Sequence, residues 1–157
     1  MKSSLFFDFD GVIVESLSAK TRAFRKIYEP YGVDIQNKVE SHHLAHGGVS
    51  RFEKFKHYHQ EFLGKSLSET EVDNLAREFS QLVLEEVINS HFSPGIISFL
   101  EKAVSKNLKI WVISGTPTDE LRVICKSLKI DHYFEGIYGS PESKDYWCKK
   151  IIDEYKL

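Results

Sequence analysis

Apolar and polar residues alternate in blocks along this chain, and the blocks predict two kinds of structural element. Short apolar runs that end at glycine or proline predict three buried strands, over residues 5–10, 108–114 and 134–139. Between the second and third runs, apolar residues recur at spacings of three and four over residues 116–130, which is typical of one helix face. A strand, a helix and a strand joined by short connections predict a parallel crossover unit.

The stretch from residue 16 to residue 92 contains no convincing strand pattern. It predicts four helices, over residues 18–30, 35–46, 50–63 and 69–90, and glycines follow the first three of them. Ser68 and Glu71 have the spacing of a capping box at the start of the fourth helix. Further helices are expected over residues 96–106 and 145–157. We therefore predict an α/β fold with a Rossmann-like parallel sheet, in which residues 1–15 and 93–157 form the core domain and residues 16–92 an inserted α-helical domain.

Two carboxylates, Asp8 and Asp10, close the first predicted strand and are followed by Gly11. Residues two apart in a strand point to the same side, so the two carboxylates project together unless the backbone turns after Asp8. Two ionised carboxylates this close repel each other, and a hard divalent cation such as Mg²⁺ relieves the repulsion. Ligands of open parallel sheets bind beyond the carboxyl ends of the strands. The pair thus predicts a Mg²⁺ site, the alternative being a solvated strand end with two unrelated acids.

Three motifs in this order resemble the haloacid dehalogenase superfamily of phosphohydrolases. The first is DFDGVIVES at residues 8–16, the second is VISGTP at residues 112–117, and the third is Lys144 in the segment 139–144. A helical insertion directly after the first motif is similar to the cap of the β-phosphoglucomutase and phosphoglycolate phosphatase branch. The resemblance covers essentially the whole chain, and we refer to the inserted helical domain as the cap.

The resemblance implies a role for each motif residue. Asp8 is expected to be the nucleophile that forms an aspartyl-phosphate, and Asp10 the general acid and base, with a pKa raised toward neutrality. The Ser114 hydroxyl and the Gly115 N–H are expected to hold phosphoryl oxygens, and Lys144 to neutralise charge on Asp8 and the phosphoryl group. Asp8 and Asp10 are the implied Mg²⁺ ligands. The implied activity is a Mg²⁺-dependent phosphatase for a small phosphorylated metabolite such as a sugar phosphate, with a phosphomutase as the close variant.

The family's fourth motif, an acidic segment that completes the Mg²⁺ site, has no counterpart in residues 145–157. Family strand order would place the corresponding strand beside the first one. We therefore expect a C-terminally incomplete fold, weak Mg²⁺ binding, and an exposed apolar sheet edge at residues 5–9 that favours self-association. Two interpretations stay open: a piece of a longer enzyme, or a truncated, catalytically impaired homologue that acts as a binding or association module.

The cap carries one further candidate, Arg51 in the segment GGVSR at residues 47–51. The segment is similar to the one by which β-phosphoglucomutase-like caps hold a substrate phosphate, and arginine binds phosphate oxygens with a planar fork. Ser50 is a candidate cap for the next helix. The alternative for Arg51 is a helix-to-helix turn with a solvated arginine. Five histidines at positions 42–59 are expected to be ordinary polar positions of the cap, and the aromatic residues of segment 52–62 its core.

Composition narrows the remaining function classes. The 157 residues carry 21 basic and 23 acidic side chains, a net charge of −2, which gives no general basic excess for nucleic acid or an anionic membrane. No apolar run approaches the roughly 20 residues of a membrane span. The two cysteines, Cys125 and Cys148, have no metal-binding spacing. We expect a reduced, cytoplasmic protein whose partner is a small phosphorylated metabolite.

Overall fold

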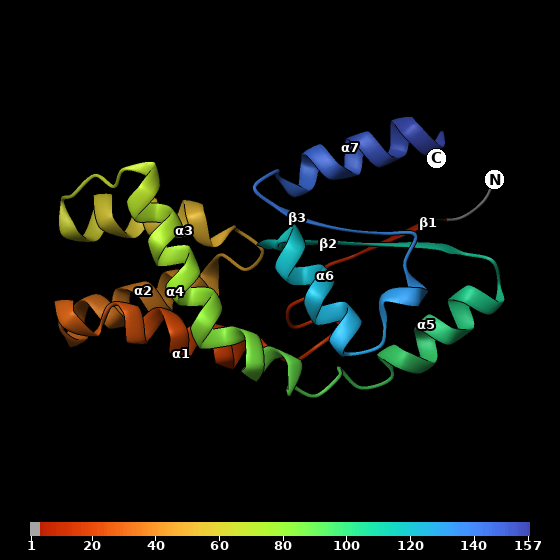
Figure 1. Ribbon diagram of the computed structural model, residues 1–157, viewed down its shortest axis with the longest axis horizontal. Coiled ribbons are helices and arrows are strands. Elements are labelled where there is room, and N and C mark those ends of the chain that lie inside the picture. Colours follow the sequence, from red (N-terminus) through yellow and green to blue (C-terminus); the bar gives the residue numbers. More distant parts are fainter. Residues whose placement is uncertain (1–3) are drawn as a thin grey trace.

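The computed structural model describes residues 4–157, and its centre is a parallel sheet (Figure 1). Within that range the sheet has three strands in the order β1-β2-β3, namely β1 (Ser4–Phe7), β2 (Lys109–Pro117) and β3 (Gly136–Ser140). Both pairings are parallel, with Phe7 opposite Val112 and Val112 opposite Ile137. The predicted parallel α/β sheet is confirmed, while residues 1–3 of the predicted core segment 1–15 lie outside the described residues.

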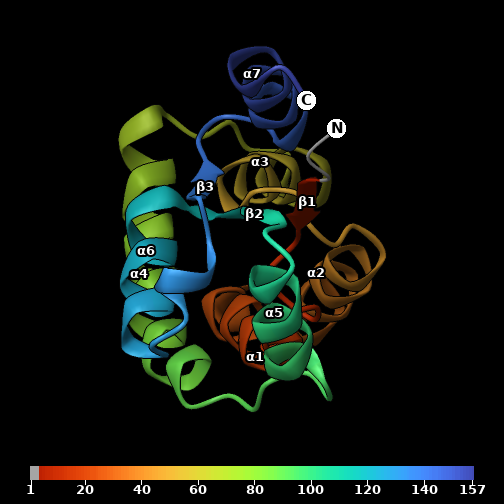
Figure 2. The same ribbon diagram turned by 90° about the vertical axis from the view of Figure 1, so that its right-hand side faces the viewer.

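Three helices cover the two faces of the sheet: α5 (Ile96–Ser105), α6 (Thr118–Ser127) and α7 (Lys144–Tyr155). Successive residues of β2 point to opposite faces. Ile110 and Val112 therefore belong to the main core with the buried residues of α5 and α6, whereas Trp111 and Ile113 pack with Ile151 of α7. Figures 1 and 2 show α7 on one side of the sheet and α5 and α6 on the other.

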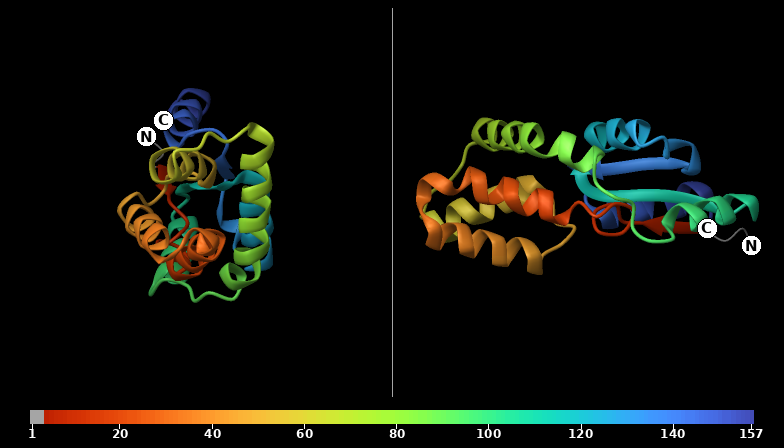
Figure 3. Two further views of the ribbon diagram at one scale, coloured as in Figure 1. Left: turned by 90° about the vertical axis from the view of Figure 1, so that its left-hand side faces the viewer. Right: turned by 90° about the horizontal axis from the view of Figure 1, so that it is seen from below.

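The remaining helices gather beyond the carboxyl ends of the strands, at one end of the elongated molecule (Figure 3, right). They are α1 (Leu17–Ile27), α2 (Val33–Ala45), α3 (Arg51–His57) and α4 (Glu69–Ile88). Short helical turns occur at η1 (Glu29–Tyr31), η2 (Tyr58–Phe62) and η3 (Asp131–Tyr133). The predicted capping box of Ser68 and Glu71 and the predicted cap by Ser50 are both confirmed.

The cap core is aromatic, as expected. Phe55 and Tyr58 are fully buried, and Phe24 of α1 contacts the rings of Phe55, Tyr58 and Phe79. The single helix predicted over residues 50–63 is instead α3 followed by the π-helical turn η2. Within this turn both Tyr58 and His59 are buried, and the Tyr28 hydroxyl and His59 Nδ1 lie 2.9 Å apart.

The chain passes from sheet to cap and back through two adjacent segments. Glu15 N donates to the His91 carbonyl, and Ser93 N donates to the Ile13 carbonyl. Val14 and Phe92 form an isolated antiparallel bridge between these segments. The division of the chain at residues 15/16 and 92/93 stays a prediction, and this paired crossing is the feature that supports it. In the part of the chain that the structure describes, no helix is long and apolar enough to cross a membrane.

Candidate functional site

The backbone turns directly after β1, so Asp8 and Asp10 do not continue the strand as the sequence pattern suggested. The strand ends at Phe7, and the Phe9 carbonyl accepts a hydrogen bond from Ile13 N at 2.8 Å. Gly11 has a φ of +74°, a backbone conformation that other residues adopt only with strain. The fully buried Phe9 side chain anchors this turn in the core. The turn leaves the two carboxylates at different places around the same cavity.

Asp8 is paired with Lys144, the residue that the third motif predicts as its partner. Lys144 Nζ donates to Asp8 Oδ2 at 2.6 Å, and the Asp8 Oδ1 atom accepts from Phe9 N at 2.8 Å. Lys144 is the first residue of α7, whose start is fixed by the Ser143 side chain accepting from Tyr146 N. The two side chains come from positions 136 residues apart, and the fold brings them together at the carboxyl end of β1.

Asp10 is held by a different lysine, which the sequence reasoning missed. Lys20 Nζ lies 2.5 Å from Asp10 Oδ2 and also donates to Thr116 Oγ1 at 2.7 Å. Ser16 donates to Asp10 Oδ1 at 2.6 Å, and the hydroxyls of Thr116 and Ser114 donate to Oδ2 at 3.2 and 3.3 Å. Ser16 and Lys20 are four residues apart, so one turn of helix places both on the same face. That spacing was the available sequence signal.

These contacts set the charge of Asp10. Burial alone raises the pKa of this carboxyl, but the Lys20 ammonium and the three hydrogen bonds from Lys20, Ser16 and Thr116 bring the pKa below its ordinary value of 3.8. In the arrangement seen here Lys20 keeps the pKa low, and a pKa raised toward neutrality beside an anionic phosphate stays a prediction. Asp10 is ionised at neutral pH, in the form that accepts a proton.

The second motif forms the carboxyl end of β2 and lies beside Asp10. The Ser114 side chain is buried and accepts from Thr116 N at 3.1 Å while it donates to Asp10. Gly115 is pressed against the cap, because a Cβ atom on it would lie only 2.7 Å from the Gly48 carbonyl oxygen. A Cβ on Gly48 would in turn lie 2.6 Å from Lys144 Nζ. The cap loop is thus closed directly over the site.

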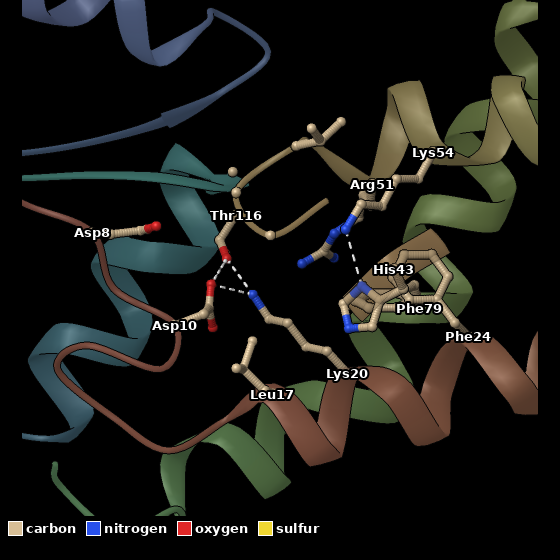
Figure 4. Close-up of a pocket in the computed structure, with 14 residues that line it drawn as sticks. Asp8, Asp10, Leu17, Lys20, Phe24, His43, Arg51, Lys54, Phe79 and Thr116 are labelled. Atoms are coloured by element: carbon tan, nitrogen blue, oxygen red, sulfur yellow. Dashed lines mark hydrogen bonds and ion pairs between the residues drawn. The ribbon is translucent and has the colours of Figure 1, made fainter. Parts of the chain in front are cut away.

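A cavity of about 140 Å³ lies between the carboxylates and the cap (Figure 4). Asp8, Asp10, Gly115 and Thr116 line it from the sheet side. The cap side is lined by Leu17, Lys20, Phe24, His43, Gly47, Gly48, Val49, Arg51, Lys54 and Phe79. Of this set, the sequence motifs predict Asp8, Asp10, Gly115 and Arg51 as site residues. They do not predict a role for Lys20, His43, Lys54 or Thr116.

Arg51 lines the cavity but is already paired. Its side chain is buried, and its two terminal nitrogens donate to the two carboxylate oxygens of Glu120 at 2.7 and 2.9 Å. Ser80 accepts a further bond at 2.6 Å, and the guanidinium lies 4.5 Å from the centre of the Phe79 ring. The interpretation as a solvated arginine is wrong. Glu120 belongs to α6, so this ion pair joins the cap to the helix that covers the sheet.

The described residues supply few side-chain ligands for a metal ion. The Asp8 carboxylate faces the cavity, whereas both oxygens of the Asp10 carboxylate accept hydrogen bonds from Lys20, Ser16 and Thr116. Among residues 4–157 no group of three or more His, Cys, Asp or Glu side chains is arranged to hold a metal ion. Mg²⁺ is commonly held by one or two carboxylates together with waters and substrate phosphate. Asp8 fits that role, and these residues alone do not close a metal site.

Comparisons with known proteins find similar sequences and similar folds. A protein of Bacillus subtilis (strain 168) named "Putative phosphatase YhcW" is 29% identical over 117 residues, which cover 74% of this chain and 50% of that protein. The structure of a β-phosphoglucomutase from Clostridium difficile matches with a TM-score of 0.73 and 28% identity, covering 92% of this chain and 64% of the other. A structure described as a "predicted phosphoglycolate phosphatase" from Haemophilus somnus 129pt shares the fold, with a TM-score of 0.71 at 21% identity over 100% of this chain and 73% of the other.

The chain spans about half the length of the curated relative it matches and under two thirds of the β-phosphoglucomutase. The model of one family, described as haloacid dehalogenase-like hydrolase, matches residues 5–151. That range contains all three motifs, the paired Asp8 and Lys144, and the whole cap. The chain therefore belongs to the haloacid dehalogenase-like hydrolases.

Proposed function

We propose that this protein is a Mg²⁺-dependent phosphatase that hydrolyses the phosphate monoester of a small metabolite through an aspartyl-phosphate on Asp8. The observation that carries the proposal is the pairing of Lys144 with Asp8, which lines the same cavity as the hydrogen-bonded Asp10. Family membership supports hydrolase chemistry, and the cavity volume of about 140 Å³ supports a small substrate. The phosphatase name of the Bacillus subtilis relative points the same way.

In this proposal the Asp8 carboxylate attacks phosphorus, forming a new O–P bond while the bond to the substrate oxygen breaks. Lys144 stabilises the charge that gathers on the transferred group. The departing oxygen takes its proton from Asp10, which later removes a proton from the water that hydrolyses the aspartyl-phosphate. Because Asp10 is ionised in the structure, it must first be protonated, and a neighbouring dianionic phosphate favours that form. A bound Mg²⁺ would supply further positive charge beside Asp8.

Two related readings share this site. A phosphomutase would return the phosphoryl group from Asp8 to a second substrate hydroxyl instead of to water, with the same Asp8, Asp10 and Lys144. An impaired homologue would keep the fold for association, and the observation that favours self-association is the position of β1. Within residues 4–157, β1 lies at an edge of the sheet and pairs with β2 alone, and its Phe6 side chain is 36% exposed.

The test of the proposed function is Asp8→Asn. An amide does not act as the nucleophile, so we expect the turnover of an aryl phosphate in the presence of Mg²⁺ to fall at least about 10³-fold. The matched control is Asp73→Asn on the exposed surface of α4, which should retain the activity of the parent protein. Turnover of Asp8→Asn near that of the parent would refute the mechanism.

Metal dependence is tested separately. A chelator should abolish turnover and added Mg²⁺ should restore it, because the proposal places Mg²⁺ beside the Asp8 carboxylate, which lines the cavity. Calorimetry should show that Mg²⁺ binds weakly without substrate, since few protein oxygens are available to replace its waters. Undiminished activity in chelator would contradict the Mg²⁺ part of the proposal.

A further inference from the structure

Lys54 is a buried cation for which the structure provides no carboxylate partner. Its side chain belongs to α3, and the residue is 3% exposed. Lys54 Nζ lies 3.0 Å from His43 Nδ1 and 5.7 Å from the centre of the Phe24 ring. Within residues 4–157 no Asp or Glu oxygen lies within ion-pair distance of this ammonium. A buried charge without a counter-charge is costly, so Lys54 is an unusual feature for a helix of the cap.

His43 of α2 is the neutral neighbour of Lys54. Burial, the main cause, and the charges of Lys54 and Lys20 together lower the pKa of His43 to about 4, against the opposing effects of Asp10 and of a hydrogen bond to the Leu17 main chain. Because Nδ1 accepts from Lys54, the ring proton is on Nε2. His43 is only 4% exposed, and its Nε2 has no hydrogen-bond partner in the described part of the chain. The pair therefore presents an ammonium without a carboxylate partner, next to an imidazole N–H that has at most the Leu17 main chain as its acceptor.

The other cations around the cavity are neutralised by fixed carboxylates. Lys20 is paired with Asp10, and the Arg51 guanidinium is paired with both oxygens of Glu120. Burial, the main cause, and the charge of Lys20 lower the pKa of Lys54 to about 8, so the ammonium is mostly protonated at neutral pH. Among the described residues that line the cavity, Lys54 is thus a buried cation without a carboxylate partner, and an anionic ligand could pair with it.

Figure 4 shows how this pair is placed relative to the proposed reaction centre. Asp8, Asp10 and Thr116 lie at one end of the cavity, and the nitrogens of His43 and Lys54 approach it from the other. Phe24 and Phe79 also line the cavity from the cap side. A ligand whose phosphoryl group is at Asp8 extends toward Lys54 and His43.

We propose that Lys54 and His43 form a second anion-binding subsite, which selects phosphate monoesters that carry a further carboxylate or phosphate group. The inference rests on the proposed function, because it takes the phosphoryl group to be bound at Asp8. It assigns the recognition of the distal group to Lys54 and His43. The sequence predicts Arg51 for the recognition of a substrate phosphate, but both terminal nitrogens of its guanidinium donate to Glu120.

The test uses three probes that differ at one end: a three-carbon alkyl phosphate with a terminal hydroxyl, a terminal carboxylate or a terminal phosphate. In the parent protein we expect kcat/KM for one of the two anionic probes to exceed that for the hydroxyl probe at least tenfold. Lys54→Met should reduce that preference to within about twofold. The matched control is Lys56→Met, which removes an exposed lysine of the same helix and should keep the preference.

A merely structural lysine would give a different pattern. Because Lys54→Met replaces an unpaired buried charge by an apolar side chain of similar length, we expect the melting temperature of the variant to be unchanged or higher than that of the parent. Loss of melting temperature with an equal fall of kcat/KM for all three probes would overturn the subsite. A parent protein that prefers the hydroxyl probe would also overturn it.

Failure of the subsite is separable from failure of the proposed function by measuring binding without turnover. In the Asp8→Asn background, calorimetry of the better anionic probe should show affinity that falls at least tenfold when Lys54→Met is added. If no probe is hydrolysed but this difference in affinity persists, the phosphatase proposal fails and the subsite stands. If the affinities are equal, the subsite fails whatever the turnover. Comparison of the carboxylate and phosphate probes shows which anion the subsite takes.

Discussion

At Asp10, burial and ion pairing act on the same carboxyl group in opposite directions. Desolvation favours the neutral acid, and the ammonium of Lys20 at 2.5 Å favours the carboxylate. The side chains of Lys20 and Asp10 are only 12% and 14% exposed, so solvent screens this pair little. The outcome is a pKa below 3.8; the largest lowering effect comes from Lys20 of the first cap helix, and hydrogen bonds from Ser16 and Thr116 add to it.

We predict that Lys20→Met destabilises the protein by about 3 kcal/mol at pH 7, since it leaves the Asp10 charge buried without its cation. In the parent, the depressed pKa of Asp10 contributes stability that is present above about pH 4 and is lost as the pH falls through the lower folded-state pKa. In the variant, burial without the Lys20 cation raises the pKa of Asp10. The ionised carboxylate then destabilises the folded protein increasingly above about pH 4. Urea unfolding at pH 7 and pH 4 measures the difference.

The control for this prediction is Lys26→Met, because Lys26 is an exposed lysine of the same helix that pairs with Glu29. It should change the free energy of unfolding by less than about 1 kcal/mol at either pH. A penalty for Lys20→Met that is the same at both pH values would show that the lysine acts through packing and leaves the titration of Asp10 unaltered.

Among the elements, the contact between the cap loop and β2 decides whether the site is closed. The loop that connects α2 and α3 meets β2 at Gly115, where a Cβ would lie 2.7 Å from the Gly48 oxygen and 3.2 Å from the Val49 oxygen. Both neighbouring atoms are main-chain atoms, which do not rotate out of the way as a side chain does. The closed arrangement therefore requires a residue without a side chain at the end of β2.

We expect Gly115→Ala to hold the cap loop away from β2 and to lower kcat/KM for phosphate monoesters at least tenfold, because closure excludes water and completes the site. The alanine N–H is retained, so loss of that donor does not account for the effect. The matched control is Gly47→Ala, where a Cβ meets nothing within 4 Å. Equal kinetics of the two variants would show that the contact is not needed for turnover.

For the whole molecule, the edge of the sheet at β1 is the feature from which we predict self-association. Phe6 of β1 is stacked on Trp111 with the ring centres 5.5 Å apart and is partly exposed. An apolar edge strand with unpaired main-chain groups favours pairing with another strand. The position of β1 beside β2 agrees with the strand order expected from the sequence.

We predict that the 157-residue chain sediments as a dimer or larger species and that Phe6→Lys shifts it toward the monomer, since a charge on an edge strand opposes pairing. Val123→Lys, on the exposed face of α6, is the control and should leave the sedimentation coefficient unchanged. A parent chain that is monomeric over the micromolar range would contradict the prediction.

The sequence by itself determined the order and type of the elements and part of the site. The alternation of apolar runs and helical spacings predicts the parallel sheet and the inserted helices, since these patterns are set by local geometry. The three motifs predict Asp8, Asp10, Ser114 and Lys144 as neighbours, and the structure brings them to one end of the sheet. Element ends were less predictable: β1 stops at Phe7, because the chain turns around the Phe9 carbonyl.

Only the tertiary structure decided the charges and partners of the site. Three contacts join side chains of different elements: Lys20 with Asp10, Glu120 with Arg51, and His43 with Lys54. The first two contacts depend on how the cap packs against the sheet domain, and the third depends on how α2 and α3 pack within the cap. A lysine or arginine has the same local sequence pattern whether it is solvated or buried. Desolvation then fixes which charges are neutralised and which remains for a ligand, and burial of this kind is a property of the packed molecule alone.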